Sequence, residues 1–288
     1  MTKPTTPLRQ RMIEDMAIRN MSLLTQTQYV RSVAKFAAHF NTSPDKLTAE
    51  DVRTYQVHLV SRGLKTATIV PIMCALRFFY GTTLGKKDMA QHIPLARRED
   101  RLPAVLSRDE VIRFIKAVTD RKMRTIFITI YAAGLRVSEV VALTAADINS
   151  QRMVIQIRQG KGRKDRYVML SEHLLKVLRD YYKHTRPPVS CLFPGQDRQQ
   201  PVTSRTVQRA CRDAATAAGL DKSVTVHTLR HCFATHLLEQ GVDIRVIQDL
   251  LGHRHITSTT RYARVALNTI RQIQSPLELL NFSETRPD

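Results

Sequence analysis

The chain has 288 residues, about twice the usual length of one domain, which favours two domains and excludes a small scaffold stapled by disulfides. Lys and Arg total 45 against 25 Asp and Glu, so the formal charge is +20 and a polyanionic partner is predicted. Hydrophobic residues make up 43% and charged residues 24% of the chain, as in globular proteins, so the charge lies on folded domains and not on a disordered tail.

The basic charge is spread over the whole chain. Residues 1–100 carry 15 basic and 8 acidic side chains, and residues 101–288 carry 30 and 17, so both halves are positive. This distribution favours nucleic acid over a small acidic ligand. The longest apolar run, Ile126 to Leu135, is far shorter than the ~20 residues that a membrane span needs. The N-terminal sequence has no secretory signal, so we expect a cytoplasmic protein without a membrane segment.

Residues 1–85 predict a small helical domain. Thr48 and Asp51 form a capping box before one apolar stripe, and Gly63 is placed to end that helix. Pro71 is expected to kink the last helix or to delay its start. From the apolar periodicity, we expect helices near residues 8–16, 29–40, 49–62 and 66–80.

A basic segment without apolar periodicity, residues 86–104, is predicted to link two domains. Such a segment is either a solvated linker or a strap that follows a DNA backbone, and the two interpretations are compatible. Its candidate DNA-binding residues are Lys86, Lys87, Arg97, Arg98 and Arg101.

Residues 105–288 predict a second domain that is mainly α with a small antiparallel β-sheet. An apolar helix over residues 124–133 is expected to end at Gly134. Two β-rich runs, Arg152–Arg158 and Asp165–Leu170, flank a basic Gly-rich tip and predict a hairpin. Further helices are expected near residues 107–118, 171–184, 203–218, 227–240 and 243–251.

Short polar segments beside helix ends carry the candidate chemistry. In GLRVSEV, Glu139 is spaced to orient the Arg136 guanidinium, as a structural ion pair or against a phosphate. The hairpin tip GKGRK presents Lys161, Arg163 and Lys164 as exposed charges that could bind DNA, and a lysine at this tip could also donate a proton to a leaving oxygen. The segments HTLRH, LLGHRH and TSTTRYARV add side chains that are most often structural when they occur singly: His227, Arg230, His253 and Tyr262.

The order and spacing of GLRVSE, GKGRKDR, HTLRHCFATHLLEQG, IQDLLGH and the later tyrosine resemble the tyrosine site-specific recombinases, or phage integrase family. The match is strongest to Xer-like and transposon-associated members and covers nearly the whole chain. It implies a helical SAM-like core-binding domain followed by a mixed α/β catalytic domain. It also implies Glu139 as a supporting carboxylate and Lys164 as a rival of Lys161. The implied catalytic set is Arg136, Lys161, His227, Arg230, His253 and Tyr262.

The resemblance implies a strand-transfer reaction without metal, ATP or any other cofactor. Tyr262 would attack a phosphodiester and hold the DNA as a 3′-phosphotyrosine, while the two arginines and His253 bind the phosphate. His227 would assist proton removal, and Lys161 would protonate the departing 5′ oxygen. The implied partners are a double-stranded DNA recombination site and further copies of the chain in a homotetramer on two sites, with an unknown accessory recombinase as an open alternative.

Other function classes stay open at this point. A non-catalytic, sequence-specific DNA-binding protein would explain the basic charge without a nucleophile. A metal-dependent nuclease needs clustered carboxylates, which the sequence does not present. His227 and His231, with His253 or His255, could ligate a metal, but no HExxH glutamate or cysteine pair accompanies them. The DNA site, and the choice among integration, excision, resolution and transposition, do not follow from the sequence.

Overall fold

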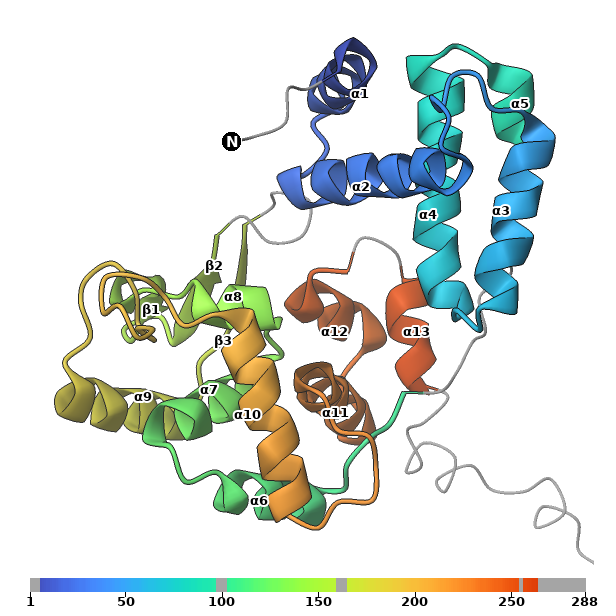
Figure 1. The fold of residues 1–288 in the computed structure, drawn as a ribbon. Helices are drawn as coiled ribbons and strands as arrows, with labels where there is room; N and C mark the ends of the chain where they lie inside the picture. Colours follow the sequence, from blue (N-terminus) through green and yellow to red (C-terminus); the bar gives the residue numbers. More distant parts are fainter. Residues whose placement is uncertain (1–5, 97–102, 159–164, 254–255, 264–288) are drawn as a thin grey trace, which may run out of the picture. The chain divides into compact units, whose positions relative to one another are not determined.

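The chain divides into two compact units, residues 1–101 and 102–288, each with a hydrophobic core of its own (Figure 1). In the part of the chain that the structure describes, no helix is long and apolar enough to cross a bilayer. This computed structural model describes residues 6–96, 103–158, 165–253 and 256–263.

The described part of the N-terminal unit consists of α1 (Pro7–Ile18), α2 (Leu23–Phe40), α3 (Ala49–Ser61), α4 (Thr66–Phe78), a π-helical turn (Phe79–Thr83) and α5 (Lys87–His92). The hydroxyls of Thr6, Ser22 and Thr48 each accept a backbone N–H in the first turn of α1, α2 and α3, so sequence-encoded caps start these helices. α4 packs against α2 over an apolar core, in which Phe36 lies edge-on to Tyr55.

The structure differs from two predictions for this unit. Of the two effects predicted for Pro71, the delayed start is wrong, because α4 begins upstream of this residue. The predicted linker, residues 86–104, starts too early, because α5 forms there and belongs to the N-terminal unit. The Arg77 guanidinium explains this, since it donates to the carbonyls of Ala90 and Gln91 at 3.1 Å each and so ties α5 to α4.

The second unit is mainly helical with a small antiparallel sheet, which confirms the predicted fold class. Before the sheet come α6 (Arg108–Ala117), α7 (Arg121–Ala133), α8 (Val137–Val141) and a 3₁₀ turn (Ala145–Asp147). After it come α9 (Glu172–Thr185), α10 (Ser204–Ala217), α11 (Val226–Glu239), α12 (Ile244–Leu251) and α13 (Thr257–Ala263).

The sheet has the strand order β1 (Ile148–Asn149), β2 (Val154–Ile157) and β3 (Arg166–Met169). The last residue of β2 pairs with Arg166, which fixes the register of the predicted hairpin. β1 was not predicted, because a strand of two residues offers no alternation to recognise. The hairpin tip, residues 159–164, lies outside the described residues.

Helix α11 positions much of the second unit. It packs against α7, and its Leu229 is fully buried in the same core as Phe127. It also fixes the start of the unit, because the Leu106 amide donates to Sγ of Cys232 at 3.2 Å and Nε2 of His236 donates to the Leu106 carbonyl at 3.0 Å. The helix that carries the HTLRH motif is therefore held rigidly by apolar and polar contacts.

Candidate active site

Four of the predicted site residues meet where the C-terminal ends of α7 and α12 face the start of α8 and the middle of α11 (Figure 1). Arg136 and Glu139 lie at the start of α8, Arg230 lies in α11, and His253 follows α12. Segments that are far apart in the sequence thus bring their phosphate-binding groups into one cluster.

Glu139 is the acceptor that this cluster shares. Its carboxylate accepts from Nη1 of Arg136 at 2.6 Å and from both terminal nitrogens of Arg166 at 2.8 Å each. Nη1 of Arg230 lies 3.7 Å from Oε2 of Glu139. Burial alone would raise the pKa of Glu139, but the hydrogen bonds and charges of Arg166 and Arg136 outweigh it and lower the pKa to about 2. Glu139 is therefore an anion at neutral pH.

Arg166 belongs to the cluster, although sequence analysis did not identify it. It is the first residue of β3, and beyond its two-pronged contact with Glu139 it donates from Nε to the Leu250 carbonyl at 2.9 Å. Only 11% of its side chain is exposed. The available signal was strand alternation, which places the final arginine of GKGRKDR on the same face as the buried Val168.

Two helix C-termini hold the arginines in place. Gly134 ends α7 at φ +63°, and its carbonyl accepts from Nη1 of Arg230 at 2.6 Å. Gly252 ends α12 at φ +60°, and its carbonyl accepts from Nη2 of Arg136 at 3.3 Å. Terminal carbonyls lack partners within their own helix and carry partial negative charge, so they suit guanidinium groups. A Cβ on Gly134 would also overlap the Phe233 ring, so this position requires glycine.

Arg230 is completely buried. Burial, followed by the charge of Arg136, lowers the pKa of Arg230 to about 9, so the group keeps its charge at neutral pH. Among the described residues, its Nε–H finds no acceptor, and a buried donor without a partner is costly. Three guanidinium groups around the single Glu139 carboxylate leave two positive charges in excess. The cluster is therefore suited to an anion with several oxygens, such as a phosphodiester.

His253 connects the arginine cluster to α13. Its Nε2 lies 3.3 Å from Nη2 of Arg230, and since a guanidinium only donates, this nitrogen accepts. The proton of the neutral ring is then on Nδ1, which lies 2.9 Å from Oγ1 of the buried Thr259. Burial first, and then the charges of Arg230 and Arg136, lower the pKa of His253 to about 3. His253 is therefore neutral in the folded protein at physiological pH.

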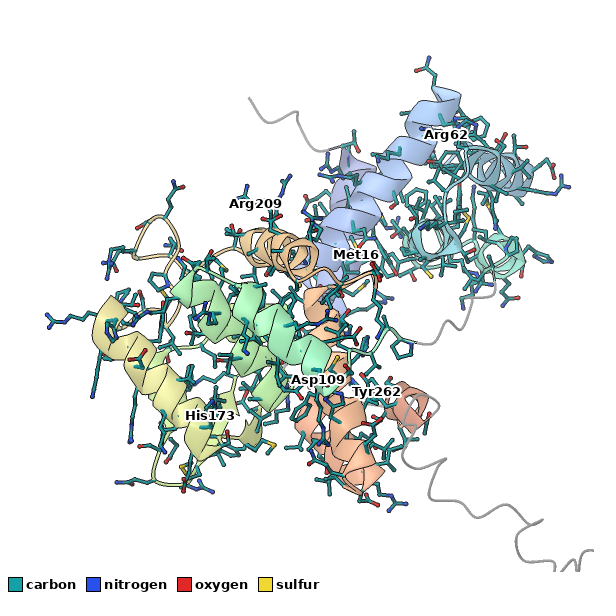
Figure 2. All side chains as sticks on the ribbon, turned by 90° about the horizontal axis from the view of Figure 1, so that it is seen from below. Met16, Arg62, Asp109, His173, Arg209 and Tyr262 are labelled. Atoms are coloured by element: carbon teal, nitrogen blue, oxygen red, sulfur yellow. The ribbon has the colours of Figure 1, made fainter. Side chains whose placement is uncertain are left out.

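Tyr262 lies in α13, and Figure 2 labels it on that helix. Its side chain is buried in a small apolar cluster with Phe233 and Leu251. Its hydroxyl oxygen lies 3.0 Å from Nδ1 of His231, and its ring is nearly parallel to that of His253, with centroids 6.3 Å apart. The predicted nucleophile thus lies beside the arginine cluster, with His253 in contact with both.

His227 and His231 lie one turn apart on α11, with ring centroids 4.6 Å apart. His227 is exposed, whereas His231 is half-buried and contacts the Tyr262 hydroxyl. The sequence suggested His231 only as a metal ligand, because Tyr262, its tertiary neighbour, is distant in sequence. Within the described ranges, no group of three His, Cys, Asp or Glu side chains is arranged to hold a metal ion.

The remaining predicted site residues are not brought into the cluster by the described part of the chain. Lys86 is exposed and donates from Nζ to the Asp45 carbonyl at 2.9 Å, and Lys87 is exposed at the start of α5. The others lie outside the described residues: Lys161, Arg163, Lys164, Arg97, Arg98 and Arg101.

Two family profiles match the chain. The one described as "Phage integrase family" matches residues 104–268, which is more than half of the chain. The one described as "Phage integrase, N-terminal SAM-like domain" matches residues 8–88. Between them the two matches account for both compact units.

Individual proteins are similar over most of their length. The protein y4qK of Sinorhizobium fredii, named for an integrase or recombinase role, is 50% identical over 96% of this chain and 90% of its own. Tyrosine recombinase XerA of Thermococcus kodakarensis is 33% identical over 88% of each chain. A solved lambda integrase tetramer bound to a Holliday junction has a TM-score of 0.72 at 18% identity, over 88% of this chain and 76% of that one, and so shares the fold.

Proposed function

Because this chain belongs to the phage integrase family and is a tyrosine recombinase, an enzyme of site-specific DNA recombination, we propose that it cuts and rejoins duplex DNA through a 3′-phosphotyrosine on Tyr262. One observation carries the proposal. The Tyr262 ring lies against His253, which contacts Arg230 in a cluster with an excess of positive charge. A tyrosine beside a phosphate-binding cluster is the pairing that nucleophilic attack on phosphorus requires.

The cluster supports stabilisation of the transition state. When the tyrosine oxygen bonds to phosphorus, negative charge builds on the nonbridging oxygens, and Arg136 and Arg230 supply fixed donors for it. The unpartnered Nε–H of Arg230 is one such donor. Glu139 holds the guanidinium groups of Arg136 and Arg166 in position, and His253 orients Arg230. Lys161 is assigned the proton that the departing 5′ oxygen needs.

The reaction conserves its bond energy. The phosphotyrosine bond replaces one phosphodiester bond, so the 5′ hydroxyl of a partner strand can reverse the attack without ATP. The cationic cluster supplies the charge stabilisation for which other nucleases use metal ions. We therefore assign no metal and no cofactor to the reaction.

The proposed partners are a double-stranded DNA recombination site and three further copies of the chain. The structurally similar lambda integrase forms a tetramer on a Holliday junction, which supports a homotetramer on two DNA sites here. The N-terminal unit, residues 1–101, is assigned to DNA binding as the core-binding domain, together with the basic residues of the hairpin tip, and residues 102–288 are assigned to catalysis. An unknown accessory recombinase is the alternative to a homotetramer.

The experiment needs a DNA site, which is first selected from a random-sequence duplex library by binding to the wild-type protein. The selected site is rebuilt with a nick next to the cleavage position, so that the short product diffuses away and religation stops. With EDTA present, the wild type is expected to form a DNA adduct that survives denaturation, and Tyr262→Phe is expected to form none. Specific binding without an adduct in the wild type would instead favour a non-catalytic DNA-binding protein.

A further inference from the structure

We propose that His231 is a catalytic residue that accepts the proton of the Tyr262 hydroxyl during attack on the phosphate. The inference rests on the proposed function, because it assigns a role to a side chain within hydrogen-bond distance of the proposed nucleophile. It differs from the role assigned to His227 above, since it moves the proton transfer one helical turn along α11.

The contact between α11 and α13 supplies the geometry. Nδ1 of His231 lies 3.0 Å from the Tyr262 hydroxyl oxygen, within hydrogen-bond distance, and the ring centroids are 5.4 Å apart. Tyr262 is 1% exposed, so bulk water has little access to its proton. A phenol needs a base within reach in order to attack at neutral pH, and a neutral imidazole nitrogen meets that need.

The other two histidines near Tyr262 are less suited to this task. His253 directs Nε2 to Arg230 and Nδ1 to Thr259, so both of its ring nitrogens are engaged in the cluster. Burial, followed by the charges of Arg230 and Arg136, opposes a further proton on that ring. His227 is exposed, and its ring lies against His231, where it can relay the proton to solvent.

The step balances in atoms and charge. The bond from the Tyr262 oxygen to phosphorus forms as the bond from phosphorus to the 5′ oxygen breaks. The Tyr262 proton moves to Nδ1 of His231, and the 5′ oxygen takes a proton from the general acid, which is Lys161 in the proposed function. In religation the same path runs backwards, and His231 returns its proton to the departing Tyr262 oxygen.

Two variants separate proton transfer from simple positioning. His231→Ala removes the side chain, whereas His231→Asn keeps an acceptor near the position of Nδ1 but does not take up a proton at neutral pH. The matched control is His173→Asn, an exposed histidine on α9 that Figure 2 labels. Each variant is first checked for its melting temperature and for binding to the selected DNA site, and single-turnover adduct formation on the nicked duplex is then measured.

A second substrate identifies which proton is lost. A duplex with sulfur in place of the bridging 5′ oxygen has a leaving group that needs no acid, so it is expected to restore adduct formation in Lys161→Ala. The same duplex is not expected to restore adduct formation in His231→Ala or His231→Asn, because the tyrosine must still lose its proton. We expect both His231 variants to be slower by about 10²-fold or more on either substrate, and His173→Asn to match the wild type.

Four results would overturn the inference. Wild-type rates in both His231 variants would leave the contact without a role in the reaction. A wild-type rate of adduct formation in His231→Asn but not in His231→Ala would show that His231 only positions Tyr262. A faster rate in His231→Ala would show that the contact restrains Tyr262. Absence of an adduct in the wild type would contradict the proposed function and this inference together. If the wild type forms an adduct and Tyr262→Phe does not, the proposed function stands, and the His231 variants then test this inference alone.

Discussion

The N-terminal unit and the catalytic unit are both mainly helical, yet their interiors are built from different side chains. Among the described residues of the N-terminal unit, the buried polar side chains are Ser32 and Thr83. The catalytic unit buries Glu139, Arg230 and His236 together with several threonines and Asp147. One interior is held together mostly by apolar contact, and the other also by charge.

The buried charges of the catalytic unit are more easily explained by function than by stability. Apolar burial stabilises a unit wherever the shapes fit. Buried charges lower stability unless every one of them is paired in good geometry, so they persist where the arrangement does something else. In the catalytic unit, Glu139 and the carbonyl ends of two helices compensate three arginines only in part. In the proposed reaction, this excess of positive charge binds the phosphate.

The largest expected effect comes from removing the shared anion. Glu139→Gln leaves Arg136, Arg166 and Arg230 without a counter-charge. We expect the free energy of unfolding of the catalytic unit to fall by about 3–5 kcal/mol, and adduct formation to slow by about 10²-fold or more. Urea unfolding and the nicked-duplex assay measure the two effects.

The control for this change is Glu50→Gln in the N-terminal unit. Glu50 pairs with Arg53 on the surface of α3, and 71% of its side chain is exposed. The expected loss is below about 0.5 kcal/mol, because exposed pairs contribute little. Equal losses in the two variants would contradict the contrast between the units.

An intermediate effect is expected from pH. Burial is the main cause that lowers the pKa of both His236 and His253, the latter to about 3, whereas histidines of the unfolded chain titrate near 6.5. Below that value the unfolded chain binds more protons than the folded protein does. The free energy of unfolding therefore decreases as the pH is lowered, by up to about 1.4 kcal/mol per pH unit for each histidine. Glu139, lowered to about 2, adds a further loss only as the pH falls below its ordinary value of 4.5.

Hydrogen exchange at about pH 7.5 and about pH 5.5 measures this separately for each unit. The catalytic unit should lose protection as the pH falls. The His236→Gln variant should show a shallower loss, because its amide can still donate to the Leu106 carbonyl without titrating. An unchanged slope in His236→Gln would refute the assignment of the pH dependence to that residue.

The smallest effect compares two equivalent helix caps. Thr48 caps α3 in the N-terminal unit, and Thr225 caps α11 in the catalytic unit, each through a reciprocal capping box. Thr48→Ala and Thr225→Ala should each lower the free energy of unfolding by about 1 kcal/mol. We expect Thr225→Ala alone to slow adduct formation, because α11 carries Arg230 and His231. Equal cleavage rates would show that the start of α11 does not position the site.

Local sequence signals predicted most of the helices and the hairpin. The capping boxes at Thr48 and Ser107 mark real helix starts, and Gly134 ends α7 as expected. These signals act over one or two turns, so the sequence alone suffices to read them. α5 was not predicted, because a contact from another helix stabilises it: Arg77 of α4 donates a hydrogen bond to the Ala90 carbonyl.

The missed parts of the site are tertiary contacts. Arg166 joins Glu139 from a strand, and His231 meets Tyr262 across two helices. Neither pairing has a fixed spacing in sequence, and an arginine on the inner face of a strand, beside the buried Val168, is unusual. Arg136, Glu139, Arg230 and His253 lie together as the motifs suggested, but the contact that orders them depends on the ends of α7 and α12.

The most direct test of the account is to identify the atom that holds the DNA. The wild-type adduct would be digested with nuclease and trypsin, and the modified peptide sequenced by mass spectrometry. The account predicts a nucleotide attached through its 3′ phosphate to Tyr262. Attachment to another residue, or through a 5′ phosphate, would contradict it.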